Sequence, residues 1–208
     1  MPKIVCLSDT HNRNEQIAVP DGDILIHAGD ATVSGTIDEI LLFSRWFDRL
    51  PHRHKIFVAG NHDRLFEINN RLARKLLGAE IVYLQDSMVE IEGLKIYGSP
   101  WQPWFFDWAF NLPRGEPLAE KWRLIPPATD VLITHGPPFG ILDFPPDGFS
   151  VGCERLRLRV EEIRPRLHVF GHIHHSYGTQ EKLGVRFVNA SNCDEAYEPT
   201  NPPIVFDL

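Results

Sequence analysis

Short apolar segments recur along the chain, and a polar cluster follows almost every one of them. Their lengths are those of β-strands buried on both faces, as in parallel sheets. Five of them occupy residues 4–7, 24–26, 56–58, 131–133 and 169–170. Residues 88–97 alternate apolar and polar side chains, and 185–188 and 204–206 are further strand candidates. We therefore expect much sheet, with hairpins and crossovers mixed in the second half of the chain.

Helical periodicity separates these segments. Helices are expected over residues 36–50, 63–77, 117–125 and 153–163. The first opens with Thr36-Ile37-Asp38-Glu39, a capping-box sequence, and Gly78 follows the second where a C-terminal glycine belongs. Strands that alternate with helices indicate an α/β fold, and no boundary divides residues 1–208 into more than one domain.

The length and composition of the chain indicate whether a bound metal ion would be structural or catalytic. The chain has 208 residues, of which 43% are hydrophobic and 24% charged, as in ordinary globular proteins. A chain of this size buries roughly 70% of the surface that its unfolded form exposes, so it needs no metal or disulfide to stay folded. We therefore expect any bound metal ion to take part in catalysis rather than to stabilise the fold.

The net charge limits the kinds of binding partner, and the cysteine content indicates the cellular compartment. The formal net charge of −7 argues against long nucleic acid as a partner. Cys6, Cys153 and Cys193 form no CxxC pair, which fits a reducing compartment. The first apolar run is too brief for a signal peptide, and no run approaches the ~20 apolar residues of a membrane span. We expect a cytoplasmic protein without a membrane partner, and the sequence leaves a homo-oligomer open.

Candidate metal ligands follow five of the strand segments. The clusters are Asp9-Thr10-His11, Gly29-Asp30, Gly60-Asn61-His62-Asp63, Thr134-His135-Gly136 and Gly171-His172-Ile173-His174. In α/β sheets the loops after the carboxyl ends of strands converge, and ligands bind there. Carboxylates, an amide and imidazoles suit Mn²⁺, iron or Zn²⁺ rather than Ca²⁺. We expect the five clusters to form one metal site.

Spacing within two of the clusters supports this expectation. Asp9 and His11 are two residues apart, as are His172 and His174. An extended backbone would place both side chains of each pair on the same face, within reach of one ion or of two adjacent ions. By the same reasoning, His175 would point away from His174.

The five clusters read D-x-H, G-D, G-N-H-D, a lone histidine and G-H-x-H, in this order, from Asp9 to His174. This pattern resembles that of the calcineurin-like metallophosphoesterases. Residues 21–30, 97–104 and 168–174 are similar to the branch called metallophosphoesterase domain-containing proteins. The resemblance implies an α/β fold in which two mixed β-sheets are flanked by helices, a four-layer αββα sandwich that holds two metal ions.

The resemblance also implies the role of each cluster. One ion would be held by Asp9, His11, Asp30 and His174, and the other by Asp30, Asn61, His135 and His172. Asp30 is then the ligand that both ions share. His62 is the implied acid or phosphate-orienting group, and Asn61 and His62 are expected to contact the substrate.

The chemistry of such a pair agrees with the resemblance. Two ions about 3.5–4 Å apart, with Mn²⁺ or iron favoured and Zn²⁺ open, can share a hydroxide that attacks phosphorus in line. An imidazole that protonates the leaving oxygen typically accelerates such a reaction roughly 10²–10⁴-fold. His62 is the candidate for this role. Arg13 and Arg64 flank the clusters and could hold a phosphate, although solvated surface arginines are an equal alternative.

The favoured function is a metal-dependent phosphodiesterase that hydrolyses small phosphodiesters such as cyclic nucleotides. A phosphomonoesterase of the same fold, or a metal- or nucleotide-binding scaffold with little turnover, is the alternative. Ala31-Thr32 follows Gly29-Asp30 where protein phosphatases carry an Asp-Arg element, which disfavours that class. The aromatic residues between 101 and 110 fit either nucleobase stacking, a partner surface or core packing, with core packing slightly favoured.

Overall fold

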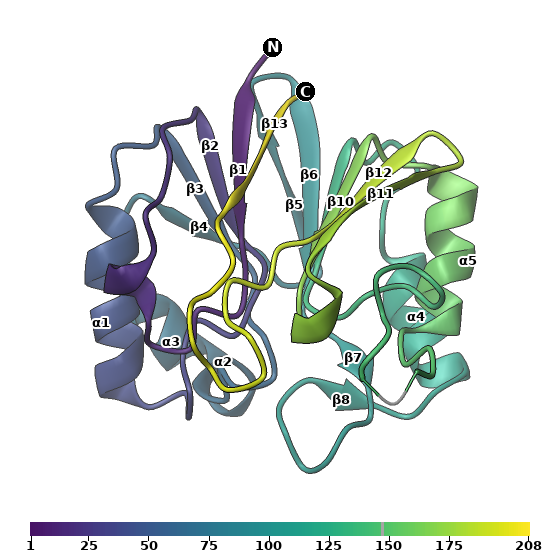
Figure 1. Ribbon diagram of the computed structural model, residues 1–208, viewed down its shortest axis with the longest axis horizontal. Helices are drawn as coiled ribbons and strands as arrows, with labels where there is room; N and C mark the ends of the chain where they lie inside the picture. Colours follow the sequence, from purple (N-terminus) through teal and green to yellow (C-terminus); the bar gives the residue numbers. More distant parts are fainter. Residues whose placement is uncertain (147) are drawn as a thin grey trace.

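Two β-sheets lie face to face at the centre of the molecule, and helices cover the outer face of each (Figure 1). The computed structural model describes residues 1–146 and 148–208. The arrangement is the four-layer αββα sandwich that the sequence led us to expect, and that part of the prediction is confirmed.

The first sheet has four parallel strands and one antiparallel edge strand. Its order is β13 (Ile204–Asp207), β1 (Lys3–Leu7), β2 (Ile24–His27), β3 (His54–Phe57) and β4 (Ile81–Tyr83). Leu7 pairs with His27, and His27 with Phe57, so β1, β2 and β3 end level with one another. The polar clusters that follow these three strands therefore start at one edge of the sheet.

The second sheet is also mixed, with antiparallel strands at both edges. Its order is β11 (Gly178–Lys182), β12 (Val185–Asn189), β10 (Leu167–Phe170), β9 (Val131–Thr134), β6 (Leu94–Ser99) and β5 (Ser87–Ile91). A two-stranded piece, β7 (Gln102–Pro103) with β8 (Asn111–Leu112), lies beyond β6 at the lower end of Figure 1. The chain ends lie at the opposite end of the sandwich.

Burial on both faces explains the apolar strands. In β1, Ile4 and Cys6 face the other sheet, whereas Val5 and Leu7 face the helices. The helices on the first sheet are α1 (Ile37–Asp48), α2 (Leu65–Ile68) and α3 (Asn70–Leu76), and those on the second are α4 (Glu116–Arg123) and α5 (Glu154–Ile163). No helix in the described ranges is long and apolar enough to cross a membrane.

One expected helix is two helices in the structure. Residues 63–77 break at Asn69, whose backbone leaves the helical region at φ −145° and ψ 73°. Its side chain then accepts a hydrogen bond from the amide of Leu72 and begins α3. The prediction of one continuous helix was wrong because an internal cap competes with helix propagation.

Gly78 also has a different role from the expected one. The residue before it, Leu77, is already extended, so no left-handed glycine ends the helix. A Cβ on Gly78 would lie 2.6 Å from the carboxyl carbon of Asp48 at the end of α1. Glycine is needed here because the two helices approach closely.

Candidate metal centre

The carboxyl ends of strands from both sheets meet at one buried group of polar side chains. The first sheet supplies Asp9, His11, Asp30 and Asn61, and the second supplies His135, His172 and His174. Asp9 and His135 are fully buried, and Asp30 is 2% exposed. The structure thus brings together all seven side chains that the sequence proposed as ligands.

The backbone reaches this arrangement by left-handed turns rather than by extended chain. Asp9, His11, Asp30 and His172 have φ values of 52°, 40°, 54° and 69°. The expectation that extended backbone aligns Asp9 with His11 was therefore wrong. Positive φ at a residue other than glycine is unfavourable and gathers at functional sites. Here it occurs at four of the seven proposed ligands.

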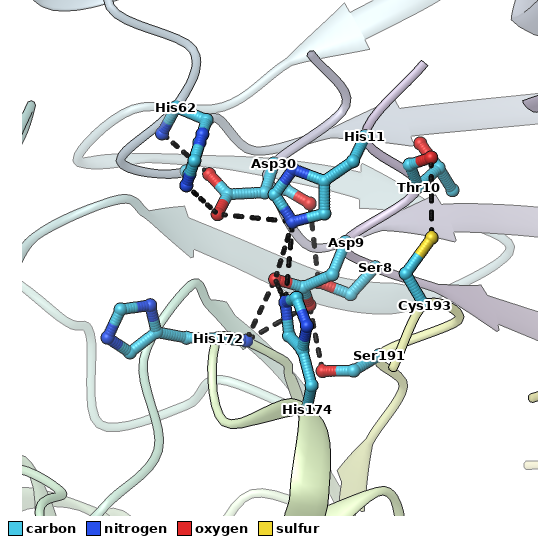
Figure 2. Close-up of polar contacts among 12 residues, drawn as sticks. Ser8, Asp9, Thr10, His11, Asp30, His62, His172, His174, Ser191 and Cys193 are labelled. Carbon is cyan, nitrogen blue, oxygen red and sulfur yellow. Dashed lines mark hydrogen bonds and ion pairs between the residues drawn. The ribbon is translucent and has the colours of Figure 1, made fainter. Parts of the chain in front are cut away.

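The first group of donor atoms surrounds Asp9. Figure 2 shows His11, His174 and the Asp9 carboxylate pointing toward one another. The Nε2 atoms of His11 and His174 are 3.3 Å apart, and Nε2 of His174 is 3.3 Å from Asp9 Oδ1. The Asp9 carboxylate is itself held by the Ser191 hydroxyl at 2.9 Å and the His172 amide at 3.0 Å. One ion could contact all three side chains.

The second group shares Asp30 with the first. His135 Nε2 is 2.9 Å from Asn61 Oδ1 and 3.3 Å from Asp30 Oδ2. The same Asp30 oxygen lies 3.9 Å from His11 Nε2, and His172 completes the group with His135 and Asp30. Asp30 therefore stands between the two groups, where a bridging ligand would be.

The orientation of three imidazoles shows that this donor set fits a cation. The Nδ1 atoms of His11, His135 and His174 each lie within hydrogen-bond distance of a backbone carbonyl, of Thr32, Ala28 and Asp194 respectively. Donation from Nδ1 leaves the Nε2 lone pair free, as in metal-binding histidines. Two such lone pairs converge between His11 and His174, where they repel unless a proton or a cation lies between them. Two nitrogens about 2.1 Å from one tetrahedral ion stand roughly 3.4 Å apart, which matches this pair.

The electrostatics of the metal-free site agree with this picture. Burial would raise the pKa of Asp9 and Asp30, but the neighbouring histidines hold both well below the usual range. Burial would likewise lower the pKa of His135 and His174, but Asp30 and Asp9 raise both to about 9. The protons on His135 and His174 therefore balance the negative charges of Asp30 and Asp9. Two bound cations would balance the same charges.

Metal binding is expected to tighten as the pH rises from about 6.5 toward 9, since an ion must displace the protons of His135 and His174. In metal-free protein, the stability that these raised pKa values confer is complete below 6.5 and is lost as the pH rises through about 9. Calorimetric titration of chelated protein with Mn²⁺ across this range measures both the affinity and the protons released. An affinity that does not change with pH would contradict the assignment of these two ligands.

His62 lies beside Asp30 and lines a cavity that opens onto the metal centre. Its Nδ1 donates to the Val33 carbonyl at 2.7 Å, and its Nε2 is 3.9 Å from Asp30 Oδ2. The ring is packed between Trp108, at a centroid distance of 4.0 Å, and Tyr197, at 6.0 Å. Nε2 of His62 is therefore fixed at the edge of the metal centre, where it could transfer a proton or approach an ion.

Arg13 and Arg64 have other partners. Arg13 donates to the Tyr197 carbonyl and forms an ion pair with Glu198 at 3.1 Å. The Arg64 guanidinium lies over the Trp108 ring, 4.7 Å from its centroid. Neither arginine is among the described residues that line the cavity. For either to hold a substrate phosphate, it would have to leave its present partner.

The aromatic stretch from 101 to 110 divides between core and cavity. Trp101 and Phe110 pack with the helix-side core of the first sheet. Trp104, Phe105 and Phe106 are 60%, 52% and 68% exposed, and together with Trp108 they line a cavity of about 690 Å³ that opens onto Asp30 and His172. The expected core packing is thus correct for part of the stretch only.

Two residues beside the ligands, Gly60 and Asp63, hold the site together. Asp63, the last residue of the G-N-H-D cluster, accepts hydrogen bonds from the amides of Gly60 and Thr32 at 2.8 and 3.0 Å. It thereby fastens the loop of Asn61 to the loop of Asp30. A Cβ on Gly60 would collide with the Asp30 carboxylate and stand 2.7 Å from Cε1 of His135. The sequence signal for both roles was that Gly60 and Asp63 belong to the same G-N-H-D cluster as the proposed ligand Asn61.

His175 lies outside the ligand groups, but its backbone differs from the extended one that was expected. Residues 174–176 form a short 3₁₀ helix, η2 (His174–Ser176), so the chain is not extended there. His175 lines the same cavity and lies 3.3 Å from the Glu195 carboxylate. The remaining histidines, His27, His52, His54 and His168, lie outside the ligand groups of the described chain.

Known proteins are similar to this chain in sequence and in fold. The family model "Calcineurin-like phosphoesterase" matches residues 2–176. Metallophosphoesterase domain-containing protein 1 of Homo sapiens is 47% identical over 231 residues, which cover 99% of this chain and 71% of that protein. The mouse protein of the same name matches to the same extent. The sequence likeness extends beyond the cluster residues to nearly the whole chain.

Solved structures agree at the level of the fold. The Phosphopantetheinyl Hydrolase of Mycobacterium tuberculosis superposes with a TM-score of 0.63 at 17% identity, covering 97% of this chain and 95% of its own. The protein TT1561 of Thermus thermophilus superposes with a TM-score of 0.60 at 13% identity, covering 99% and 98%. With the donor groups built on Asp9, Asp30 and His135, these likenesses lead to one conclusion. The chain belongs to the calcineurin-like phosphoesterase family.

Proposed function

We propose that this protein is a phosphodiesterase that hydrolyses small phosphodiesters, such as cyclic nucleotides, at a centre of two metal ions. The proposed ligands are Asp9, His11, Asp30 and His174 for one ion, and Asp30, Asn61, His135 and His172 for the other. The observation that carries the proposal is the place of Asp30, within 4 Å of imidazole nitrogens from both groups. Mn²⁺ or iron is favoured, and Zn²⁺ also suits these donors.

Bound divalent ions would act as Lewis acids, lowering the pKa of a coordinated water and polarising the phosphoryl oxygens. The chain supplies the electrostatic setting. Asp9 and Asp30 carry two negative charges, which balance only half the charge of two divalent ions. A phosphate ester is therefore attracted locally, although the formal net charge of the chain is −7.

His62 is the proposed proton donor to the leaving oxygen. Its Nδ1–H is engaged by the Val33 carbonyl, so Nε2 can donate a proton only when the ring is doubly protonated. Packing against Trp108 keeps the ring in one orientation. The proton would pass from Nε2 to the departing alkoxide.

The cavity favours a diester over a monoester. Arg114 is the one lysine or arginine among the described residues that line it, and its guanidinium already binds Glu154 and the carbonyls of Val151 and Gly152. A monoester dianion would find no free cationic side chain among these residues, so only the ions could offset its second charge. A diester has one charge and two organic groups, and a cavity of about 690 Å³ with aromatic walls has room for both.

The test compares esters and metals on the same preparation. Chelated protein is supplied with Mn²⁺, Fe²⁺ or Zn²⁺ in turn, and its metal content is measured. Rates are then compared for bis(p-nitrophenyl) phosphate, p-nitrophenyl phosphate and cyclic AMP. We expect two ions per chain and faster hydrolysis of the diesters. Faster hydrolysis of the monoester would favour the phosphomonoesterase, and ions bound without turnover of any ester would favour the scaffold.

We also propose a cytoplasmic location. All three cysteines, Cys6, Cys153 and Cys193, are free and buried in the structure. Unpaired cysteines are typical of reducing compartments.

A further inference from the structure

A segment beyond the part matched by the family model reaches back to the metal centre. The match ends at residue 176, whereas Tyr197 lies against three histidines of the site. Its ring centroid is 4.5 Å from that of His11, 5.8 Å from His174 and 6.0 Å from His62. The side chain is 39% exposed and lines the cavity. Tyr197 is therefore placed to touch whatever binds beside the ligands.

The position of Tyr197 is held by the backbone around it. Its φ is 60°, a left-handed value that a bulky residue seldom adopts. The Asp194 carboxylate accepts the amides of Ala196 and Glu198, and Arg13 donates to the Tyr197 carbonyl. Arg13 also pairs with Glu198 at 3.1 Å. These contacts fix residues 194–198, which we call the Tyr197 wall, to the loop that carries Asp9 and His11.

A second aromatic side chain stands at the other group of ligands. The Phe105 ring centroid is 5.9 Å from that of His172, and Phe105 is 52% exposed within the same cavity. Tyr197 and Phe105 thus flank the two ends of the centre. Exposed aromatic rings on a cavity wall offer flat apolar surfaces against which another ring can pack.

The polar groups near these rings limit the kind of ring that fits. Arg114 binds Glu154 and the carbonyls of Val151 and Gly152, and the Glu195 carboxylate on the Tyr197 wall lies 3.3 Å from His175. No uncommitted lysine or arginine of the described chain lines the cavity, so a second anionic group on the substrate would be unpaired.

We propose that the cavity beside the metal centre is a binding subsite for a flat, uncharged ring on the non-leaving group of a phosphate ester, and that Tyr197 determines this specificity. The proposal rests on the proposed function, because it concerns the substrate of the same site. It assigns to the Tyr197 wall the recognition of the ring, while the ligands and His62 act on the phosphate. Nucleobases and phenyl groups have the required chemistry.

Two esters with one leaving group test the proposal. Phenyl p-nitrophenyl phosphate and methyl p-nitrophenyl phosphate differ only in the group that stays on phosphorus. For the Mn²⁺-loaded protein we expect kcat/KM to favour the phenyl ester by about tenfold, since an aromatic contact is worth ~0.5–1.5 kcal/mol beyond the area that the ring buries. Tyr197→Ala should lower this ratio about three- to tenfold, whereas Tyr197→Phe should keep it. A ratio that is unchanged in Tyr197→Ala, or a wild-type protein without preference, would overturn the proposal.

A binding measurement separates this inference from the proposed function. Phenylphosphonate and methylphosphonate undergo no hydrolysis, and their Kd values for the Mn²⁺-loaded protein can be measured by calorimetry. Tighter binding of phenylphosphonate that Tyr197→Ala removes would support the subsite even if no ester were turned over. Phe149→Ala is the matched control, because Phe149 is 75% exposed and is not among the described residues that line the cavity. A loss of selectivity in this control would contradict the assignment to Tyr197.

Discussion

Asp30→Asn is expected to lower kcat/KM for bis(p-nitrophenyl) phosphate by more than about 10³-fold, beyond the loss of a single charge-stabilising donor. Asp30 Oδ2 is within 4 Å of His11, His62 and His135 at once. Asparagine keeps the shape, and its carbonyl oxygen can still accept the His62 amide, which now lies 2.7 Å from Asp30 Oδ1. It removes the negative charge that two ions would share, so metal content should fall as well.

Asp23→Asn is the matched control for this variant. Asp23 comes just before β2, at the end of the strand opposite to Asp30, and it accepts the Lys3 amide at 2.7 Å. Turnover and metal content should both stay at the wild-type level. If Asp30→Asn kept two ions and a tenth or more of the activity, Asp30 would not bridge the centre.

His62→Asn is expected to lower kcat by roughly 10²–10⁴-fold while both ions stay bound, since general acid catalysis contributes that much. The loss should be larger for a diester with a poor leaving group, such as cyclic AMP, than for a nitrophenyl ester whose anion departs without a proton. The ratio of the two losses separates proton donation from a change in the fold, which would lower both rates together.

Metal content distinguishes the two roles open to His62. Its ring nitrogen lies with donor atoms of His11 and Asp30 inside a group that could hold an ion. If His62→Asn lost one ion per chain, His62 would be a ligand and the assignment as an acid would be wrong. His52→Asn serves as the control, because His52 binds the Pro20 carbonyl and lies outside the ligand groups of the described chain.

The strands and the ligand clusters were predictable because their signals are local. A run such as Ile4 to Leu7 is apolar since both of its faces are buried, and the chemistry-bearing residues follow it at once. The level ends of β1, β2 and β3 then bring Asp9, Asp30 and Asn61 together. A hydrophobic pattern combined with residue type was therefore enough to find the candidate site.

What the sequence did not reveal depends on partners distant along the chain. Arg13 is directed by Glu198, which lies 185 residues away, and Arg64 by the Trp108 ring. The left-handed turns at Asp9 and His172 arise where loops of the two sheets meet, and the His172 amide donates to Asp9 across 163 positions. Tyr197 likewise reaches His11 because the segment before it runs beside the end of β1, where the amides of Asn192 and Cys193 donate to the carbonyls of Ser8 and Asp9. Neither propensity nor spacing encodes such contacts.

The ligands are divided between two sheets that meet near the site at an isolated bridge between Ser8 and Ser191. Elsewhere an apolar core that includes Ile26, Val58 and Ile133 separates the two sheets. A sub-ångström sliding of one sheet over the other would alter every distance between Asp30 and His135. Substitutions in this distant core are therefore expected to change the affinity for metal as well as the stability of the fold.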